Sequence, residues 1–298
     1  MASRTASGGG PFRRRGLIAG LIHDWAVTLP FVVAIAWLLV GPAANLVVDS
    51  LRDPAGGVSA LNWRDVVANP LTRRAIVSSL GVGVTVASLT TLIGVPLAWC
   101  ISRLRIGSRS VAAAALNVAA NIPATSLVFG FAAAFGGAGM VTLALRLVWA
   151  DAPALNIYGA TGLVFVFLYF HVPLFVLLVL PAMGAVTEEL WEAANVCGAG
   201  PLRFWRRVGL PVLAPFILAG WILMFVWAIG QYGVPLALGG GEGAMNLMTL
   251  RIGDLIQFIG STNRFERAAC LSLLLIVLSV VALWLYRSLL RRALRWLA

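Results

Sequence analysis

Residues 187–211 are the part of this 298-residue chain whose residue types and spacing could do chemistry. They read TEELWEAANVCGAGPLRFWRRVGLP, a run polar enough to leave a membrane although apolar runs flank it. Thr187 stands at the N-cap of an expected helix, and Glu188 and Glu189 follow in the first turn, where the helix dipole favours acids. With no nucleophile or metal-ligand cluster nearby, the run indicates recognition of a partner and no catalytic site.

The first half of this run has the period of an amphipathic helix with two distinct faces. An anionic lipid surface would repel the acidic face, so a protein partner suits it better than a membrane surface. The apolar face is expected to hold Leu190, Ala194 and Cys197, with Trp191 beside them, and the acidic face Glu188, Glu192 and Asn195.

A bend should follow, because Gly198, Gly200 and Pro201 interrupt the helix. If the bend needs a positive φ at Gly198, a β-branched residue there would be strained. Pro201 suits the first position of a second short helix. That second helix would present a basic and aromatic surface made of Arg203, Phe204, Trp205, Arg206 and Arg207.

The composition of the chain shows which class of protein carries this bent element. The chain is 60% apolar and 11% charged, with a mean hydropathy of +0.94, against about 45–50% and about 25% in soluble domains. It is therefore an integral membrane protein. All 22 basic residues are arginines, so the lysine of a phosphate-binding P-loop is missing and the chain cannot hydrolyse ATP by such a loop of its own.

Six apolar runs reach the length of about 20 residues that a membrane-crossing helix needs, which predicts an all-α polytopic protein with six transmembrane helices. The third run is longer than one crossing requires, and Gly136 and Gly137 predict a break there. The runs are Trp25–Val48, Ala75–Ile101, Ser110–Leu147, Gly159–Pro181, Leu213–Leu238 and Ala268–Leu290.

Arginine asymmetry sets the expected orientation. Fourteen arginines fall on the side that holds both tails, residues 102–109 and residues 187–207, and eight fall on the other side. Both termini are therefore expected in the cytoplasm, and the net charge of +11 is assigned to contacts with anionic lipid and not to nucleic acid. The tail Met1–Arg15 resembles the start of a signal peptide and is expected to be an uncleaved signal anchor.

Residues 187–211 resemble a segment of a known protein family. Six positions look like the EAA motif of permease subunits of binding-protein-dependent ABC importers, with the spacing that the motif has. Val196, Cys197 and Gly200 depart from residues that are frequent in the family. The six matching positions are Glu192, Ala193, Ala194, Gly198, Leu210 and Pro211.

The resemblance implies a type I ABC importer permease fold in the bacterial inner membrane. Residues 1–24 would be a cytoplasmic tail, 25–48 the first transmembrane helix, 73–290 a five-helix core with a coupling helix at 187–207, and 291–298 a second tail. The coupling helix would sit in a groove of an ATPase subunit. Its contact residues would be Glu188, Glu192, Ala193, Ala194, Gly198, Arg203, Leu210 and Pro211.

The same resemblance implies the other components of the transporter. Two ATPase subunits would bind ATP and magnesium, a second permease chain would complete a heterodimer, and an external solute-binding protein would deliver the cargo. This chain would carry no cofactor and no enzymatic activity. Residues 229–241 and 250–256 look like the corresponding stretches of spermidine/putrescine permeases and their iron(III), thiamine and aminophosphonate relatives, so a polyamine-like cargo is the first expectation.

Polar residues within the spans are candidates for the pathway, because burying them in lipid is costly unless they are satisfied. Asn121, Gln231 and Tyr232 are the candidates, and the alternative for each is an interhelical hydrogen bond without cargo contact. Two histidines, His23 and His171, cannot form a multi-histidine metal site.

Two other classes of membrane protein compete with this interpretation. An ion-coupled secondary transporter would need acids or histidines at mid-membrane, and none of the eleven acids falls in the middle of an expected span. A membrane-embedded enzyme would need a metal or nucleophile constellation, which the sequence lacks.

Overall fold

The chain is described by a computed structural model over residues 12–53, 57–149, 157–239, 245–257 and 263–297, with side chains described between 28 and 291. Within these ranges the regular structure is helical, apart from one isolated antiparallel bridge between Arg52 and Val58. The all-α prediction is confirmed.

Six stretches of the described chain are long and apolar enough to cross a membrane, as predicted. Helices α1, α3 and α13 supply three of them, α5 with α6 supplies another, α7 with η1 supplies the next, and α9, η2 and α10 together supply the remaining one. The elements are α1 (Phe12–Ser50), α2 (Leu61–Ala68), α3 (Pro70–Ser102), α4 (Ile106–Ala120), α5 (Ala124–Phe135), α6 (Met140–Val148), α7 (Ala160–Val179), the 3-10 helix η1 (Leu180–Ala185), α8 (Glu188–Val196), α9 (Pro201–Phe204), the π-helix η2 (Trp205–Gly209), α10 (Leu210–Gly230), α11 (Gly233–Ala237), α12 (Met248–Gln257) and α13 (Arg264–Leu297).

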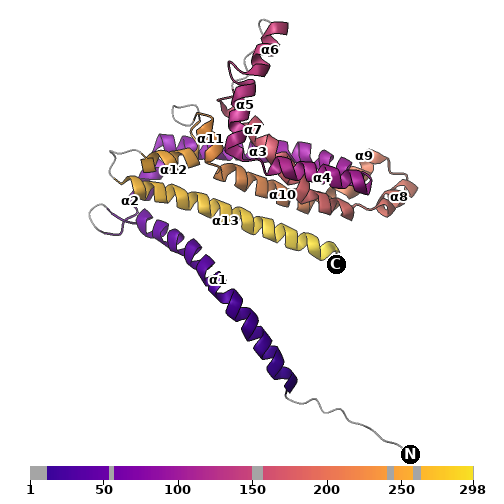
Figure 1. Ribbon diagram of the computed structural model, residues 1–298, viewed down its shortest axis with the longest axis horizontal. Coiled ribbons are helices and arrows are strands. Elements are labelled where there is room, and N and C mark those ends of the chain that lie inside the picture. Colours follow the sequence, from indigo (N-terminus) through magenta and orange to yellow (C-terminus); the bar gives the residue numbers. More distant parts are fainter. Residues whose placement is uncertain (1–11, 54–56, 150–156, 240–244, 258–262, 298) are drawn as a thin grey trace, which may run out of the picture.

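The long helices form one bundle (Figure 1). Helix α3 packs against both α7 and α10, α13 packs along α10, and α4 packs along α7. Helix α1 contacts α13 and diverges from the rest of the bundle, and the most apolar part of its span has no buried residue. Helices α8 and α9 and the C-terminal end of α13 lie at one end of the bundle, and α2, α11 and α12 lie at the other (Figure 1).

The centre of the bundle is held by an aromatic ring between two glycines. Phe175 of α7 is fully buried. A Cβ atom on Gly94 of α3 would lie 2.5 Å from the Phe175 ring, and one on Gly220 of α10 would lie 2.7 Å from it. Small residues let helix backbones approach closely in membrane bundles, so these two glycines set the separation of α3, α7 and α10.

The third apolar run differs from the expected single span. The predicted break at Gly136–Gly139 is confirmed, since α5 ends at Phe135 and α6 begins at Met140. A second break separates α4 from α5 at residues 121–123. Pro123 explains it, because proline lacks an N–H donor and disfavours a helical conformation in the residue before it. Ser110–Leu147 therefore lies in three helices: α5 keeps contact with α7 and α11, whereas α6 projects away from the bundle (Figure 1).

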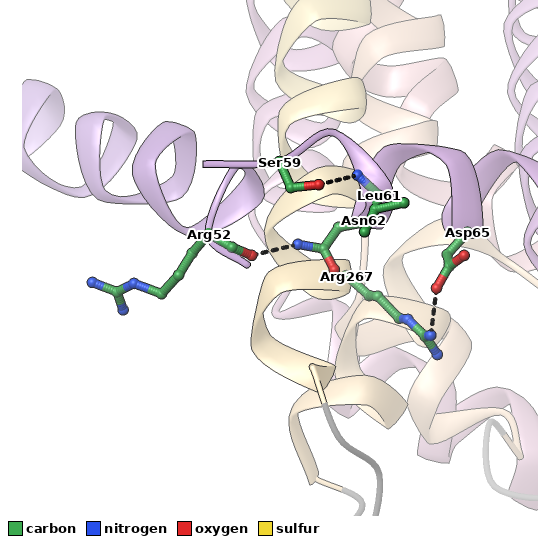
Figure 2. A network of polar contacts seen from close by, with 6 residues as sticks. All are labelled: Arg52, Ser59, Leu61, Asn62, Asp65 and Arg267. Atoms are coloured by element: carbon green, nitrogen blue, oxygen red, sulfur yellow. Dashed lines mark hydrogen bonds and ion pairs between the residues drawn. The ribbon is translucent and has the colours of Figure 1, made fainter. Parts of the chain in front are cut away.

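Local capping and polar contacts fix the end of the bundle opposite to α8. Asn69 Oδ1 caps α3 by accepting from the backbone N–H of Leu71 at 2.9 Å. Figure 2 shows how α2 is tied to the end of α1 and to α13: Asn62 Nδ2 donates to the Arg52 carbonyl at 2.8 Å, and Arg267 of α13 pairs with Asp65 of α2 at 2.7 Å.

Candidate functional site

The predicted two-piece element is present and its bend is a regular helix C-cap. Helix α8 ends at Val196, and Gly198 follows with φ of +73°. The Gly198 N–H donates to Asn195 O and the Ala199 N–H to Ala194 O, both at 2.9 Å, which is the Schellman arrangement. The conditional expectation of a positive φ at Gly198 is confirmed.

At the start of α8 the structure corrects one expectation. Thr187 occupies the N-cap position, but its side chain makes no capping hydrogen bond. Glu188 does not extend freely toward a partner either. Its Oε2 accepts from Arg103 Nη1 at 2.6 Å, and the Arg103 guanidinium lies 4.1 Å from the centre of the Trp99 ring. Glu188 therefore ties α8 to the end of α3.

Aromatic side chains hold the two pieces of the element on the bundle. Trp191 of α8 meets Phe204 of α9 edge to face, with ring centres 4.9 Å apart, and Phe204 is 1% exposed. Trp205 meets Trp99 of α3 edge to face at 4.6 Å. These contacts join α8, α9 and the end of α3 into one packed unit.

The short π-helix η2 connects this unit to α10. A Cβ atom on Gly209 would lie 2.7 Å from the Trp205 ring, so the glycine leaves room for the indole. π-Helical turns inside α-helical segments are frequent at functional sites. Leu210 and Pro211 follow at the exposed start of α10.

The predicted apolar face of α8 was partly wrong. Trp191 and Ala194 pack against the core, whereas Leu190 and Cys197 are exposed. The reason is that Phe204, which lies beyond the bend, covers Trp191 and not the Leu190 side of the helix.

Asn195 is exposed like Glu188 and Glu192, with which it was expected to share a face, but its side chain is engaged within the element. In the amide orientation that satisfies both of its polar atoms, it accepts from Trp191 Nε1 at 2.9 Å and donates to Ala199 O at 3.3 Å. Its side chain thus supports the bend of the element.

What remains exposed on α8 is a mixed acidic and apolar face. Glu189, Glu192 and Ala193 are exposed, and Val196 is 88% exposed. Among the residues that the structure describes, Glu189 and Glu192 form no ion pair. This face is free to meet another molecule.

Arg203 belongs to a different surface from Glu192. It lines a cleft of about 620 Å³ together with Arg206 and Arg207, and the bend residues Gly198 and Gly200 line the same cleft. The structure thus separates the predicted contact residues into an acidic helix face and a basic cleft.

The three predicted pathway residues lie at breaks in two helices. Asn121 caps the end of α4, where its Nδ2 donates to Asn117 O at 2.8 Å. Gln231 ends α10, and its carbonyl accepts from Thr249 Oγ1 at 2.9 Å. Tyr232 Oη accepts from Gln257 Nε2 at 3.1 Å.

The two breaks lie close to each other. Helix α11 packs on α5, and a Cβ atom on Gly233 would lie 3.6 Å from the Thr125 side chain. Tyr232 covers Gly253 of α12, where a Cβ atom would lie 2.7 Å from its ring, and both residues line a pocket of about 330 Å³. Gln231 and Tyr232 are thus brought together with α12, and Asn121 lies at the neighbouring break.

Other groups considered from the sequence make no metal site in the described residues. His171 is fully buried, and its Nδ1 lies 2.9 Å from the Phe167 carbonyl oxygen. Several residues of the unit around α8 were missed by sequence reasoning: Trp99 and Arg103, which pack there, and Gly209. The only local signal for them was a tryptophan and an arginine flanking the end of an apolar run.

Comparison with known proteins gives a family match over almost the whole chain. The family model described as "Binding-protein-dependent transport system inner membrane component" matches residues 10–295.

Individual relatives are more distant. A probable ABC transporter permease protein, y4fN of Sinorhizobium fredii, is 26% identical over 255 residues, which are 82% of this chain and 42% of that protein. This chain thus spans less than half the length of that relative. The sulfate transport system permease protein CysT of Salmonella typhimurium is 25% identical over 76% of this chain and 77% of its own length. The spermidine/putrescine transport system permease protein PotB of Haemophilus influenzae is 24% identical over 91% and 92%.

One solved structure has the same fold. A chain of a bacterial ABC transporter involved in the import of the acidic polysaccharide alginate matches with a TM-score of 0.63 at 18% identity, covering 94% of this chain and 98% of that chain.

Proposed function

The chain belongs to the family of binding-protein-dependent transport system inner membrane components, and from this premise we propose that it couples ATP hydrolysis on partner subunits to solute movement through the exposed face of α8. As a member of this family it is a multi-pass inner-membrane permease subunit of an ABC importer, which removes the ion-coupled alternative. Catalysis of ATP hydrolysis belongs to the partner ATPase subunits.

One observation carries the proposal. The face of α8 that holds Glu192, Ala193 and Val196 is exposed at the end of the bundle, while the opposite face is packed on aromatic side chains. A helix with one free face and one firmly packed face suits a partner with a matching groove. Glu192 supplies a charge-assisted hydrogen bond to that groove, worth about 1.5–3 kcal/mol when it is partly desolvated.

The packed face gives the element its mechanical role. Arg103–Glu188, Trp99–Trp205 and Trp191–Phe204 link α8 and α9 to the end of α3 and the start of α10. A displacement of α8 by the ATPase would therefore move these helix ends together instead of unfolding the segment. Leu210 and Pro211 pass the same movement into α10.

The proposed complex contains this chain, a second permease chain, two ATPase subunits and an external solute-binding protein. The ATPase subunits hold ATP and magnesium. Both termini of this chain lie on the side of the ATPases. The placement of α8, α9 and the C-terminal end of α13 at one end of the bundle supports this orientation (Figure 1).

The cargo is a small polar solute that passes the two neighbouring helix breaks. Broken helices expose backbone groups to a central cavity in transporters, and Asn121, Gln231 and Tyr232 add hydrogen-bonding and aromatic groups there. Such groups suit transient contact with a polar or cationic solute. A polyamine-like solute remains the first candidate, and iron(III), thiamine and aminophosphonate are alternatives.

Cross-linking from α8 tests the coupling role. In a complex where Cys100 and Cys197 are replaced by serine, Val196→Cys should cross-link to the ATPase subunit. Val58→Cys, which alters a residue that is 87% exposed at the other end of the bundle, is the matched control and should not. Uptake into proteoliposomes should require ATP and the ATPase subunits; uptake driven by an ion gradient alone, or no cross-link from position 196, would contradict the proposal.

A further inference from the structure

A basic cleft lies at the bend and the second piece of the element, and neither Glu189 nor Glu192 of α8 lines it. Its volume is about 620 Å³. Three arginines, Arg203, Arg206 and Arg207, line it, and all three are exposed. The remaining lining residues are small or apolar: Gly198, Gly200, Pro201 and Leu202.

No acid balances these charges. In the part of the chain that the structure describes, none of the three arginines forms an ion pair. The acid of α8 that does form one, Glu188, pairs with Arg103. Three guanidinium groups around one cleft repel one another unless an anion joins them. Guanidinium groups bind phosphate oxygens in a planar, often bidentate geometry, so the cleft has the chemistry of a phosphate site.

The position of the cleft identifies the source of the phosphate. Arg206 and Arg207 lie in η2, within the first nine residues of the candidate membrane span that begins at Pro201 and continues into α10. Trp205 packs on Trp99 at the same level, and tryptophan is typical of the boundary between lipid and water. The cleft therefore lies at the depth of the lipid headgroups.

An apolar wall distinguishes a lipid from a free anion. Leu202 lines the cleft and is 84% exposed, with Pro201 beside it, also exposed. A free phosphate ion would leave this apolar surface in water. A phospholipid would cover it with its glycerol and acyl region while its phosphate meets the arginines, as basic residues do at membrane surfaces.

We propose that the cleft binds the phosphate group of an anionic phospholipid, which holds the second piece of the coupling element at the membrane surface. The lipid would occupy the side of the bend that the acidic face of α8 does not use. The site is independent of the identity of the cargo. It makes coupling depend on anionic lipid, because the lipid would set the position of the packed unit of α8 and α9 relative to the membrane surface.

The test uses the assembled transporter in nanodiscs of phosphatidylcholine with a minor fraction of phosphatidylglycerol. Native mass spectrometry measures retained phosphatidylglycerol for the wild type, for Arg206→Gln with Arg207→Gln, and for a control pair, Arg105→Gln with Arg109→Gln, at the same end of the bundle but outside the cleft. The cleft pair should lose about tenfold in retained lipid, and the control pair should stay within about twofold of the wild type. Arg206→Lys with Arg207→Lys should restore part of the retention, since it keeps the charge but not the planar fork.

Three results would overturn the proposal. Equal losses of retained lipid in the cleft and control pairs would mean that retention depends on the overall surface charge and not on the cleft. Displacement of the lipid by inorganic phosphate at millimolar concentration would make a free anion the ligand. Unchanged lipid retention together with weaker ATPase association in the cleft pair would assign the cleft to the protein partner; association is read by size-exclusion chromatography, which also verifies assembly.

Discussion

Arg103 and Glu188 are 85 positions apart in sequence, and Arg103 Nη1 donates to Glu188 Oε2 at 2.6 Å. The pair joins the end of α3 to the first turn of α8. Both side chains remain substantially exposed, 41% and 60%, so the pair adds only about 0–1 kcal/mol to stability. Its role is to orient α8, which leaves Glu189 and Glu192 as the exposed acids of this helix without an ion pair, Glu192 lying one turn beyond Glu188.

Charge reversal at Glu192 should uncouple the transporter. Glu192→Lys removes an acceptor and places a like charge against whatever donor the groove presents. Losing a charge-assisted hydrogen bond worth about 1.5–3 kcal/mol should lower ATP hydrolysis stimulated by loaded binding protein at least about tenfold. Glu188→Gln should have a smaller effect, because Arg103 rather than the partner holds that acid. ATPase assays of the reconstituted complex measure both. Full stimulation with Glu192→Lys would remove α8 from the coupling role.

Gly198 should be intolerant of side chains for a backbone reason alone. Nothing lies within 4 Å of a Cβ built there, but φ is +73°, so Gly198→Val should cost about 1–3 kcal/mol at the bend and abolish stimulated hydrolysis. Gly200 is the matched control: it also has open space, and its φ is −67°. Gly200→Val should keep most of the stimulation. Equal loss in the two variants would mean that side-chain bulk, and not φ, is responsible.

Packing around Phe175 should govern the stability of the bundle. Gly94→Val places atoms where the Phe175 ring lies and should cost about 1–3 kcal/mol by overpacking. Gly81→Val on the same helix meets nothing within 4 Å and should leave the thermal unfolding midpoint in detergent nearly unchanged. Adding Phe175→Leu to Gly94→Val should recover part of the loss. A midpoint shift of equal size for the Gly81 and Gly94 variants would contradict this account.

The helix breaks should affect uptake without affecting assembly. Asn121→Ala, Gln231→Ala and Tyr232→Ala should change the apparent affinity or rate of uptake while the complex with the ATPase still purifies intact. Tyr232→Phe removes only the hydroxyl that accepts from Gln257, so its effect should be smaller than that of Tyr232→Ala. Uptake kinetics in proteoliposomes provide the measurement. Wild-type kinetics in all three alanine variants would move the pathway elsewhere.

Orientation is testable with thiol reagents that do not cross membranes. Val58→Cys in intact cells should be labelled from outside. Cys197, which is exposed on α8, serves as the internal control and should be labelled only after permeabilisation. The reverse pattern would invert the topology; it would also place α8 away from the cytoplasmic ATPases.

Local patterns in the sequence were enough for the spans and for the bend. Hydropathy over about 20 residues depends only on neighbouring side chains, so six spans could be predicted. The bend at Gly198 could also be predicted from a local signal, because a glycine that follows the end of a helix commonly adopts a positive φ. The break before α5 could also have been predicted from Pro123, but the hydropathy of the surrounding apolar run predicts no break before Gly136.

Only the tertiary structure decided which side chains meet across the chain. Trp191 faces inward and Leu190 outward because Phe204, from beyond the bend, covers one side of α8; helical periodicity alone placed both near the apolar face. Glu188 is tied to Arg103, and Arg203 joins Arg206 and Arg207 in a cleft, although sequence placed Glu188 and Arg203 in one contact set. These outcomes depend on contacts between segments distant in sequence, or on the direction the chain takes after a turn. Neither is encoded in the period or the charge of a single segment.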